Sequence, residues 1–130
     1  MDWHYVKPLH TTNLIAEFAE HTGYDLPEAF RVCVAANNGG RPERRNFIAG
    51  GSPRLLKRFL SLNKDDRENA WSALKWADIA GTDRVPFAVD EFGNAVCFIK
   101  GDGSVVFIDH ESGAQSVIAR DFDAFLRSLF

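Results

Sequence analysis

The sequence predicts an α+β protein in which a mostly antiparallel sheet, ending in a three-strand meander, is packed by about four helices. Three observations predict this class. Apolar residues repeat at helical spacing early in the chain, three β-rich runs separated by short turns follow residue 84, and helical spacing returns after residue 121. The length of 130 residues is typical of one domain, so we expect residues 1–130 to fold as a single unit.

The first forty residues carry two helical patterns. The first helix is expected to begin at Thr12 or Asn13, either of which can cap it, and to stop at Gly23. The second contains Pro27 in its first turn, where the missing N–H has no helical partner to lose. It is expected to end in "NNGG", residues 37–40, because Asn and Gly tolerate positive φ.

The middle of the chain is less regular. "RRNFIAG" is compatible with a short strand, whereas "PRLLKRFLSL", residues 53–62, fits either an amphipathic helical turn or a strand, and we favour a strand. In "DDRENAWSALKWADIAG", residues 65–81, helical spacing predicts a helix that is capped by Asp65 or Asp66 and closed by Gly81.

The C-terminal part of the chain changes period. The runs "VPFAVDE", "NAVCFIK" and "SVVFIDHE" predict three consecutive antiparallel strands. Between the last two, Asp102-Gly103 predicts a two-residue type I′ hairpin, which needs positive φ at both positions. "ESGAQSVIAR" is expected to form a loop and one further extended stretch. Asp121 is expected to cap a last helix that packs on the sheet through Phe122, Phe125, Leu126 and Leu129.

Charge is distributed unevenly along the chain, although the net charge is only −3. Residues 41–76 carry a net charge of +5, while the segments before and after them carry −3 and −5. Such asymmetry can steer a charged partner, or the segments can interleave in the fold and mix their charges. The basic segment has no nucleic-acid motif, so we expect a solvated face and no direct nucleic-acid binding.

Cysteine use and hydropathy indicate the compartment. Cys33 and Cys97 lie inside apolar runs without a Cys-x-x-Cys motif, which favours buried free thiols in a reducing environment. The N-terminal stretch has no secretory-signal pattern, and no apolar run approaches the roughly 18 residues of a membrane span. We therefore expect a cytoplasmic protein without a membrane partner.

Two pairs of acidic residues are the first candidates for enzyme chemistry: Asp90 with Glu91, and Asp109 with Glu111. Neighbouring residues of a strand point to opposite faces, so Asp90 and Glu91 cannot both reach one substrate. Asp residues at strand ends commonly bond backbone N–H groups instead. The histidines show no ligand spacing, and neither a nucleophile elbow nor a phosphate loop is present. We expect no catalytic site, metal or cofactor, and an enzyme using the Asp90 and Asp109 edge is the less favoured alternative.

Four stretches, taken together, resemble the SUKH superfamily. They are "LPEAFRVCVAANNGG", "VPFAVDEFGNAVCFI", "VVFIDHES" and "VIARDFDAFLRSLF", in the family's order and spacing. The resemblance covers roughly residues 12–40 and 85–130. It implies an α+β fold with a mostly antiparallel sheet, and it implies that six residues form structural turns: Asn38, Gly39, Pro86, Asp90, Gly93 and Asn94.

The resemblance also implies a function. Bacterial single-domain members of the superfamily look like immunity proteins that bind and neutralise the toxin domain, often a nuclease, of a polymorphic toxin. A basic nuclease would favour an acidic contact surface, and the candidate contact residues are Glu91, Asp102, Asp109, Glu111 and, as aromatic anchor, Trp76. The alternative is a regulatory or scaffolding protein-binding module of the Smi/Knr type.

Overall fold

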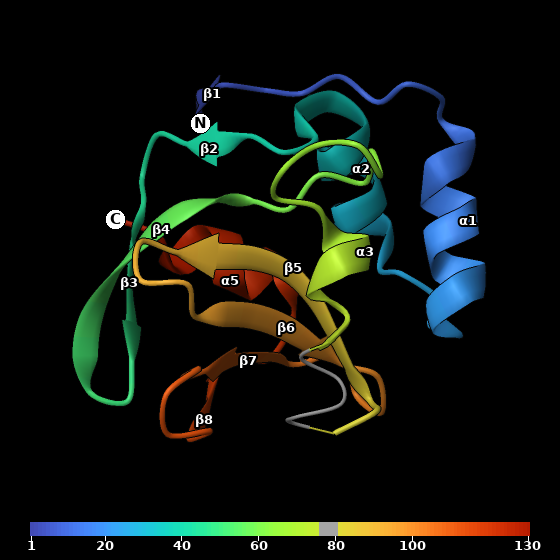
Figure 1. Cartoon of the computed structure of the whole chain (residues 1–130). Helices are drawn as coiled ribbons and strands as arrows, with labels where there is room; N and C mark the ends of the chain where they lie inside the picture. Colours follow the sequence, from blue (N-terminus) through green and yellow to red (C-terminus); the bar gives the residue numbers. More distant parts are fainter. Residues whose placement is uncertain (76–80) are drawn as a thin grey trace.

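The computed structural model describes residues 1–75 and 81–130 and confirms the α+β class (Figure 1). Its main sheet has six antiparallel strands in the order β3-β4-β5-β6-β7-β8, and β1 pairs with β2 in a second, two-stranded sheet. The strands are β1 (Trp3–His4), β2 (Arg41–Pro42), β3 (Asn46–Ala49), β4 (Ser52–Phe59), β5 (Arg84–Asp90), β6 (Ala95–Ile99), β7 (Val105–Ile108) and β8 (Gln115–Ala119). The expected meander is thus the centre of a larger sheet.

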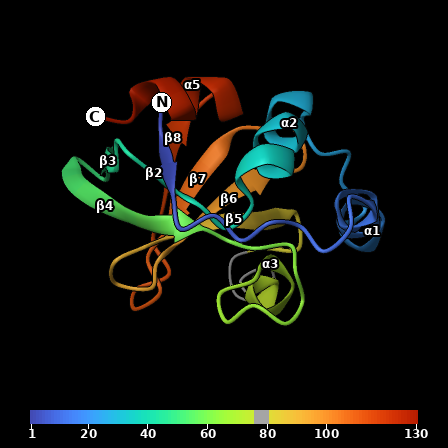
Figure 2. The same ribbon diagram turned by 90° about the horizontal axis from the view of Figure 1, so that it is seen from above.

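The helices of the described ranges are α1 (Asn13–Thr22), α2 (Glu28–Asn37), α3 (Ala70–Ala73) and α5 (Phe122–Ser128). Figure 2 shows α2 and α5 on one side of the sheet and α3 on the other. In the same view, α1 lies at the edge of the molecule nearest to α2. None of the helices in these ranges has the length and apolar character needed to cross a membrane.

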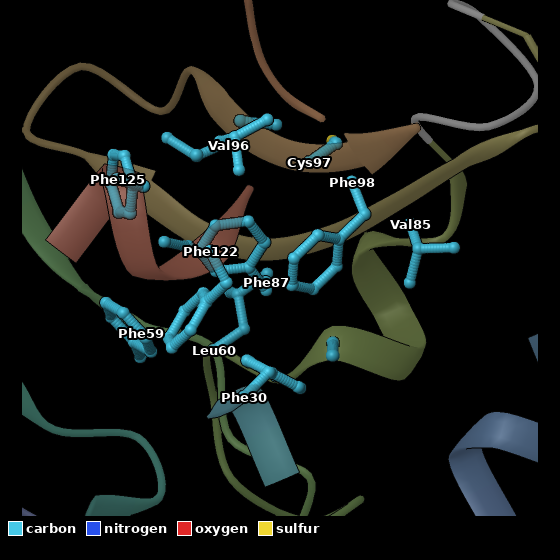
Figure 3. Packing of buried hydrophobic residues seen from close by; sticks show 14 of the residues in the cluster. Phe30, Phe59, Leu60, Val85, Phe87, Val96, Cys97, Phe98, Phe122 and Phe125 are labelled. Carbon is cyan, nitrogen blue, oxygen red and sulfur yellow. The ribbon is translucent and has the colours of Figure 1, made fainter. Parts of the chain in front are cut away.

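Phenylalanine rings fill the space between the sheet and the helices α2 and α5 (Figure 3). Phe87 of β5 lies at the centre, with its ring 4.4 Å from that of Phe98 and stacked on it. It also contacts four further rings from β4, α2 and α5, those of Phe30, Phe59, Phe122 and Phe125. Aromatic pairs in such offset and edge-to-face geometries stabilise a core beyond the area that they bury.

Several predicted helix ends agree with the structure. Gly23 ends α1 with a left-handed φ of 69°, and the Asp121 carboxylate caps α5 by accepting from the Ala124 N–H at 2.8 Å. Thr12 occupies the N-cap of α1 without a side-chain hydrogen bond. Pro27 lies at the N-cap of α2, one position before the expected first turn, because its ψ of 142° is not helical.

The structure corrects the start of the third helix. Residues 65–69 are not helical, and α3 begins at Ala70 with Asn69 as the N-cap, which accepts from the Ser72 N–H at 2.8 Å. Asp66 instead accepts hydrogen bonds from Ser61 and Asn63 within the preceding turn. These bonds outweigh the opposing effect of partial burial and lower the pKa of Asp66. The strand assignment for "PRLLKRFLSL" is confirmed as far as Phe59.

The Asp102-Gly103 hairpin prediction was wrong in its turn type. The loop has four residues, because the N–H of Ile99 donates to Ser104 O and the N–H of Gly103 donates to Ile99 O. Only Gly103 has positive φ, at 73°. The Asp102 carboxylate accepts from the backbone and hydroxyl of Ser104, and these bonds lower its pKa.

The two cysteines are free thiols. Cys97 is buried in β6 and burial raises its pKa to about 12, whereas Cys33 is half-buried on α2 with a pKa raised by burial to about 11. Both thiols are therefore protonated at neutral pH and are poor nucleophiles.

Candidate functional site

The buried side chain of Asp90 forms hydrogen bonds that hold the turn between β5 and β6. Its side chain is only 1% exposed, and Oδ1 accepts from the backbone N–H groups of Phe92 and Asn94 at 2.9 and 2.8 Å. Oδ2 accepts from Asn94 Nδ2 at 2.9 Å. A buried carboxylate engaged in this way holds a loop in place. Both oxygens of Asp90 are therefore engaged in structural hydrogen bonds.

Asn94 links this turn to the next loop of the same sheet end. Its Oδ1 accepts from the His110 N–H at 2.9 Å and lies 2.6 Å from His110 Nδ1. Both loops lie at one end of the sheet, on the left of Figure 1, because alternate turns of an antiparallel sheet share an end. The chain Asp90–Asn94–His110 therefore joins residues 91–94 to residues 109–114.

The tip of the β5–β6 turn carries an exposed aromatic side chain. Gly93 has a φ of 83°, and its N–H donates to Asp90 O at 3.3 Å, so residues 91–93 form a short three-residue loop. Asn94 does not share the positive φ that its residue type permits. Phe92, at the middle of this loop, is 76% exposed. A large apolar ring held in solvent on a fixed loop is suited to entering a partner's pocket.

The acidic residues beside Phe92 differ in how strongly they are engaged. Glu91 forms an ion pair with Arg45, whose Nε also donates to Leu56 O. Asp109 accepts from the N–H groups of Ser112 and Glu111, and these bonds lower its pKa. The side chain of Glu111 is 85% exposed. Glu111 is thus the most accessible carboxylate of these three.

Apolar residues of the neighbouring hairpin continue this surface. The Glu91 N–H donates to Leu55 O at 3.0 Å, which places β4 next to the loop. Leu55 and Ile48 face outward from the β3–β4 hairpin and are 38% and 52% exposed. We call the residues Leu55, Glu91, Phe92, His110 and Glu111 the loop surface.

The structure separates one of the predicted contact residues, Asp102, from this surface. Asp102 lies in the β6–β7 turn at the opposite end of the sheet, where its charge helps burial to raise the pKa of Tyr24. Trp76 lies outside the described residues. Within the described ranges, no cluster of three or more His, Cys, Asp or Glu side chains is arranged to hold a metal ion.

The comparison with protein families decides the relationship of the chain. The model of the SMI1 / KNR4 family (SUKH-1) matches residues 10–128. The chain is a member of this SUKH family. A search of curated proteins finds no significant match to it.

The remaining turn residues of the SUKH pattern have defined places. The side chain of Asn38 is buried at the end of α2, where its Nδ2 donates to Lys7 O and Ser61 Oγ and its Oδ1 accepts from the Leu62 N–H. Gly39 follows with a φ of 67°. Pro86 lies within β5, next to a β-bulge, and not in a turn. Asn38 thus joins three segments that are distant in the sequence.

Sequence reasoning missed Phe92, and it grouped Asp102 with acidic residues that lie at the other end of the sheet. The signal for Phe92 was present, because a residue at the centre of "EFGN" belongs to the turn and cannot face the sheet. The sequence also indicated that Asp102 lies apart from Asp109 and Glu111, because successive turns of a meander alternate between the two ends of the sheet.

Proposed function

We propose that this SUKH protein is an immunity protein that binds a cognate toxin domain in a one-to-one complex and neutralises it by occlusion. SUKH domains are commonly immunity proteins, and membership of the family supports the proposal. The observation that carries it furthest is Phe92, an exposed aromatic ring on a loop that buried hydrogen bonds hold rigid.

A rigid loop favours binding because little conformational entropy is lost when the partner docks. In the proposed complex, Phe92 enters a pocket of the toxin, and Leu55 adds apolar area beside it. Glu111, with Glu91 and Asp109, faces basic groups around the toxin's substrate groove, as a nuclease domain would present. Acting in this way, the protein would protect the cytoplasm of a bacterial cell.

The first experiment is capture of the tagged protein from its native host, with mass spectrometry of the retained protein, followed by titration of the purified partner. We expect the partner's toxic activity to fall linearly and to vanish at one equivalent. Inhibition at far below one equivalent would contradict occlusion and indicate turnover. A retained host protein without toxic activity would instead favour a regulatory module of the Smi/Knr type.

Phe92→Ala is expected to weaken this complex strongly without affecting folding. An aromatic anchor contributes about 2 kcal/mol or more, so the dissociation constant should rise about 30-fold or more by calorimetry. Val32→Ala is the matched control, because Val32 is a similarly exposed apolar residue on α2, 65% exposed. If both variants bind as tightly as the parent protein, Phe92 is not the anchor.

Glu111→Lys is expected to slow association with a basic partner. Peripheral charges act mainly on the association rate, and we expect a decrease of about tenfold at low salt that shrinks as salt is added. Glu17→Lys makes the same charge change at an exposed position on α1 and should leave the rate near that of the parent protein. Equal effects of the two variants in stopped-flow measurements would exclude a local contact at Glu111.

A further inference from the structure

A second polar feature of the molecule lies away from the loop surface. Four residues, Tyr5, Lys7, Arg41 and Arg58, line a hollow of about 350 Å³, and none of these lining residues is acidic. They come from the segment after β1, from β2 and from β4, so the hollow exists only in the folded chain. We call these four residues the Tyr5 pocket.

Backbone acceptors position the two arginines of the Tyr5 pocket. Arg58 donates from Nε and Nη2 to Gly39 O at 3.0 and 2.9 Å, and from Nη2 to Tyr5 O at 3.2 Å. Arg41 donates from Nε to Lys57 O at 2.9 Å, and its guanidinium lies over the Tyr5 ring, 5.3 Å from the centroid. The cations are therefore preorganised, which reduces the cost of ordering them around a ligand.

Positive charge in the Tyr5 pocket is only partly compensated. In the described part of the chain, Lys7 Nζ has no hydrogen bond or ion pair, although its charge contributes to lowering the pKa of Asp66, and the terminal nitrogens of Arg41 have no acceptor. Arg58 Nη1 is 3.7 Å from Glu68, a carboxylate that also pairs with Lys57 at 3.1 Å. The positioned arginines and the nearby Lys7 amine thus give the hollow a positive lining with donors left over, which suits an anion.

The backbone at Tyr5 supports a ligand-binding role. Tyr5 has a φ of 56°, the one positive φ at a non-glycine position in the described ranges. This conformation is unfavourable for a residue with a side chain and is concentrated at functional sites. It leaves the Tyr5 ring 69% exposed at the mouth of the hollow, where its hydroxyl can donate to an anion.

We propose that the Tyr5 pocket binds the phosphate group of a small molecule, such as inorganic phosphate or a mononucleotide. Three cations around one concavity suit a group that carries close to two negative charges. A nucleic-acid polymer would need cations spaced along its backbone, whereas these three line a single hollow. A neighbouring hollow shares Lys7 and Arg58 with the Tyr5 pocket but also contains Asp66 and Glu68, whereas the lining of the Tyr5 pocket has no acidic residue.

The test is an NMR titration of the ¹⁵N-labelled chain at pH 7.5, with ionic strength held constant by sodium chloride. Inorganic phosphate and adenosine monophosphate are expected to shift amide signals of residues 4–7, 39–41 and 57–58 with a saturating curve. Shifts that spread over the whole basic segment or fail to saturate would overturn the proposal. Much tighter binding of a ten-nucleotide single-stranded DNA than of the mononucleotide would replace the small ligand by a polymer.

Lys7→Gln should separate a built site from general electrostatics. Lys7 is exposed and its amine has no structural bond, so the variant is expected to fold as the parent chain does. Loss of one partly exposed charge contact should raise the dissociation constant for phosphate about fivefold. Arg44→Gln removes one positive charge from the basic segment at an exposed position outside the pocket and should leave the constant unchanged. Equal effects of the two variants would overturn the assignment.

Discussion

Replacing Phe87 by alanine is expected to lower the free energy of unfolding by about 4 kcal/mol, the largest stability effect of any single change proposed for this protein. The side chain is 1% exposed and contacts five other phenylalanine rings. Its removal eliminates apolar burial and leaves a cavity between the sheet and two helices, which cannot both collapse into the space.

Guanidinium titration followed by circular dichroism measures this loss. Phe92→Ala, the same substitution at an exposed position, should change the free energy of unfolding by less than about 0.5 kcal/mol. Phe87→Leu retains most of the volume and should cost about 1 kcal/mol, so it stays measurable if the alanine variant unfolds. Similar losses for Phe87→Ala and Phe92→Ala would contradict the position of Phe87 at the centre of the core.

Asp90→Ala is expected to lower the free energy of unfolding by about 3 kcal/mol, because buried donors lose a charged acceptor. Three hydrogen bonds disappear together, two from backbone N–H groups and one from the Asn94 amide. The Asn94 amide also accepts from His110, so the loss should extend to the β7–β8 loop.

Asp90→Asn distinguishes the two carboxylate oxygens. The amide oxygen can still accept from the N–H groups of Phe92 and Asn94, but the new amide NH2 group faces Asn94 Nδ2, which is also a donor. We expect a smaller loss of about 1–2 kcal/mol in urea titrations. NMR spectra should show the His110 N–H signal shifted in both variants. An alanine variant as stable as the parent chain would show that Asp90 does not hold this turn.

The hydrophobic patterns predicted most of the fold because each element follows a local rule. Gly23 ends α1, since only glycine adopts left-handed φ without strain, and Asp121 caps α5. The start of α3 was mispredicted because residues 65–69 contain several polar residues that can cap a helix. The hydrogen bonds of Asp66 to Ser61 and Asn63 select Asn69 as the cap, and they require contacts outside the helix.

The candidate site was less predictable than the fold. Its carboxylates lie in turns whose positions the sequence indicates, but their availability depends on neighbours from other strands. Arg45, which precedes β3, pairs with Glu91, whereas Glu111 lies 4.0 Å from His110 Nε2 and its side chain stays 85% exposed. The Tyr5 pocket could not be predicted from the sequence either, because it combines a segment near residue 5 with β2 and β4.

The sequence by itself determined the α+β class, the family, and the places of the turns, because alternation of apolar residues and turn-forming residues act over a few neighbours. Only the tertiary structure decided which polar groups face solvent and which are consumed in the fold. Asp90 is buried and accepts a hydrogen bond from Asn94, whereas Phe92, two residues later, is exposed. The pairing of β5 with β6 turns the Asp90 side chain inward and leaves Phe92 at the tip of the loop. The cations of the Tyr5 pocket line one hollow for the same reason: long-range pairing of strands, not local spacing, sets which side chains are neighbours.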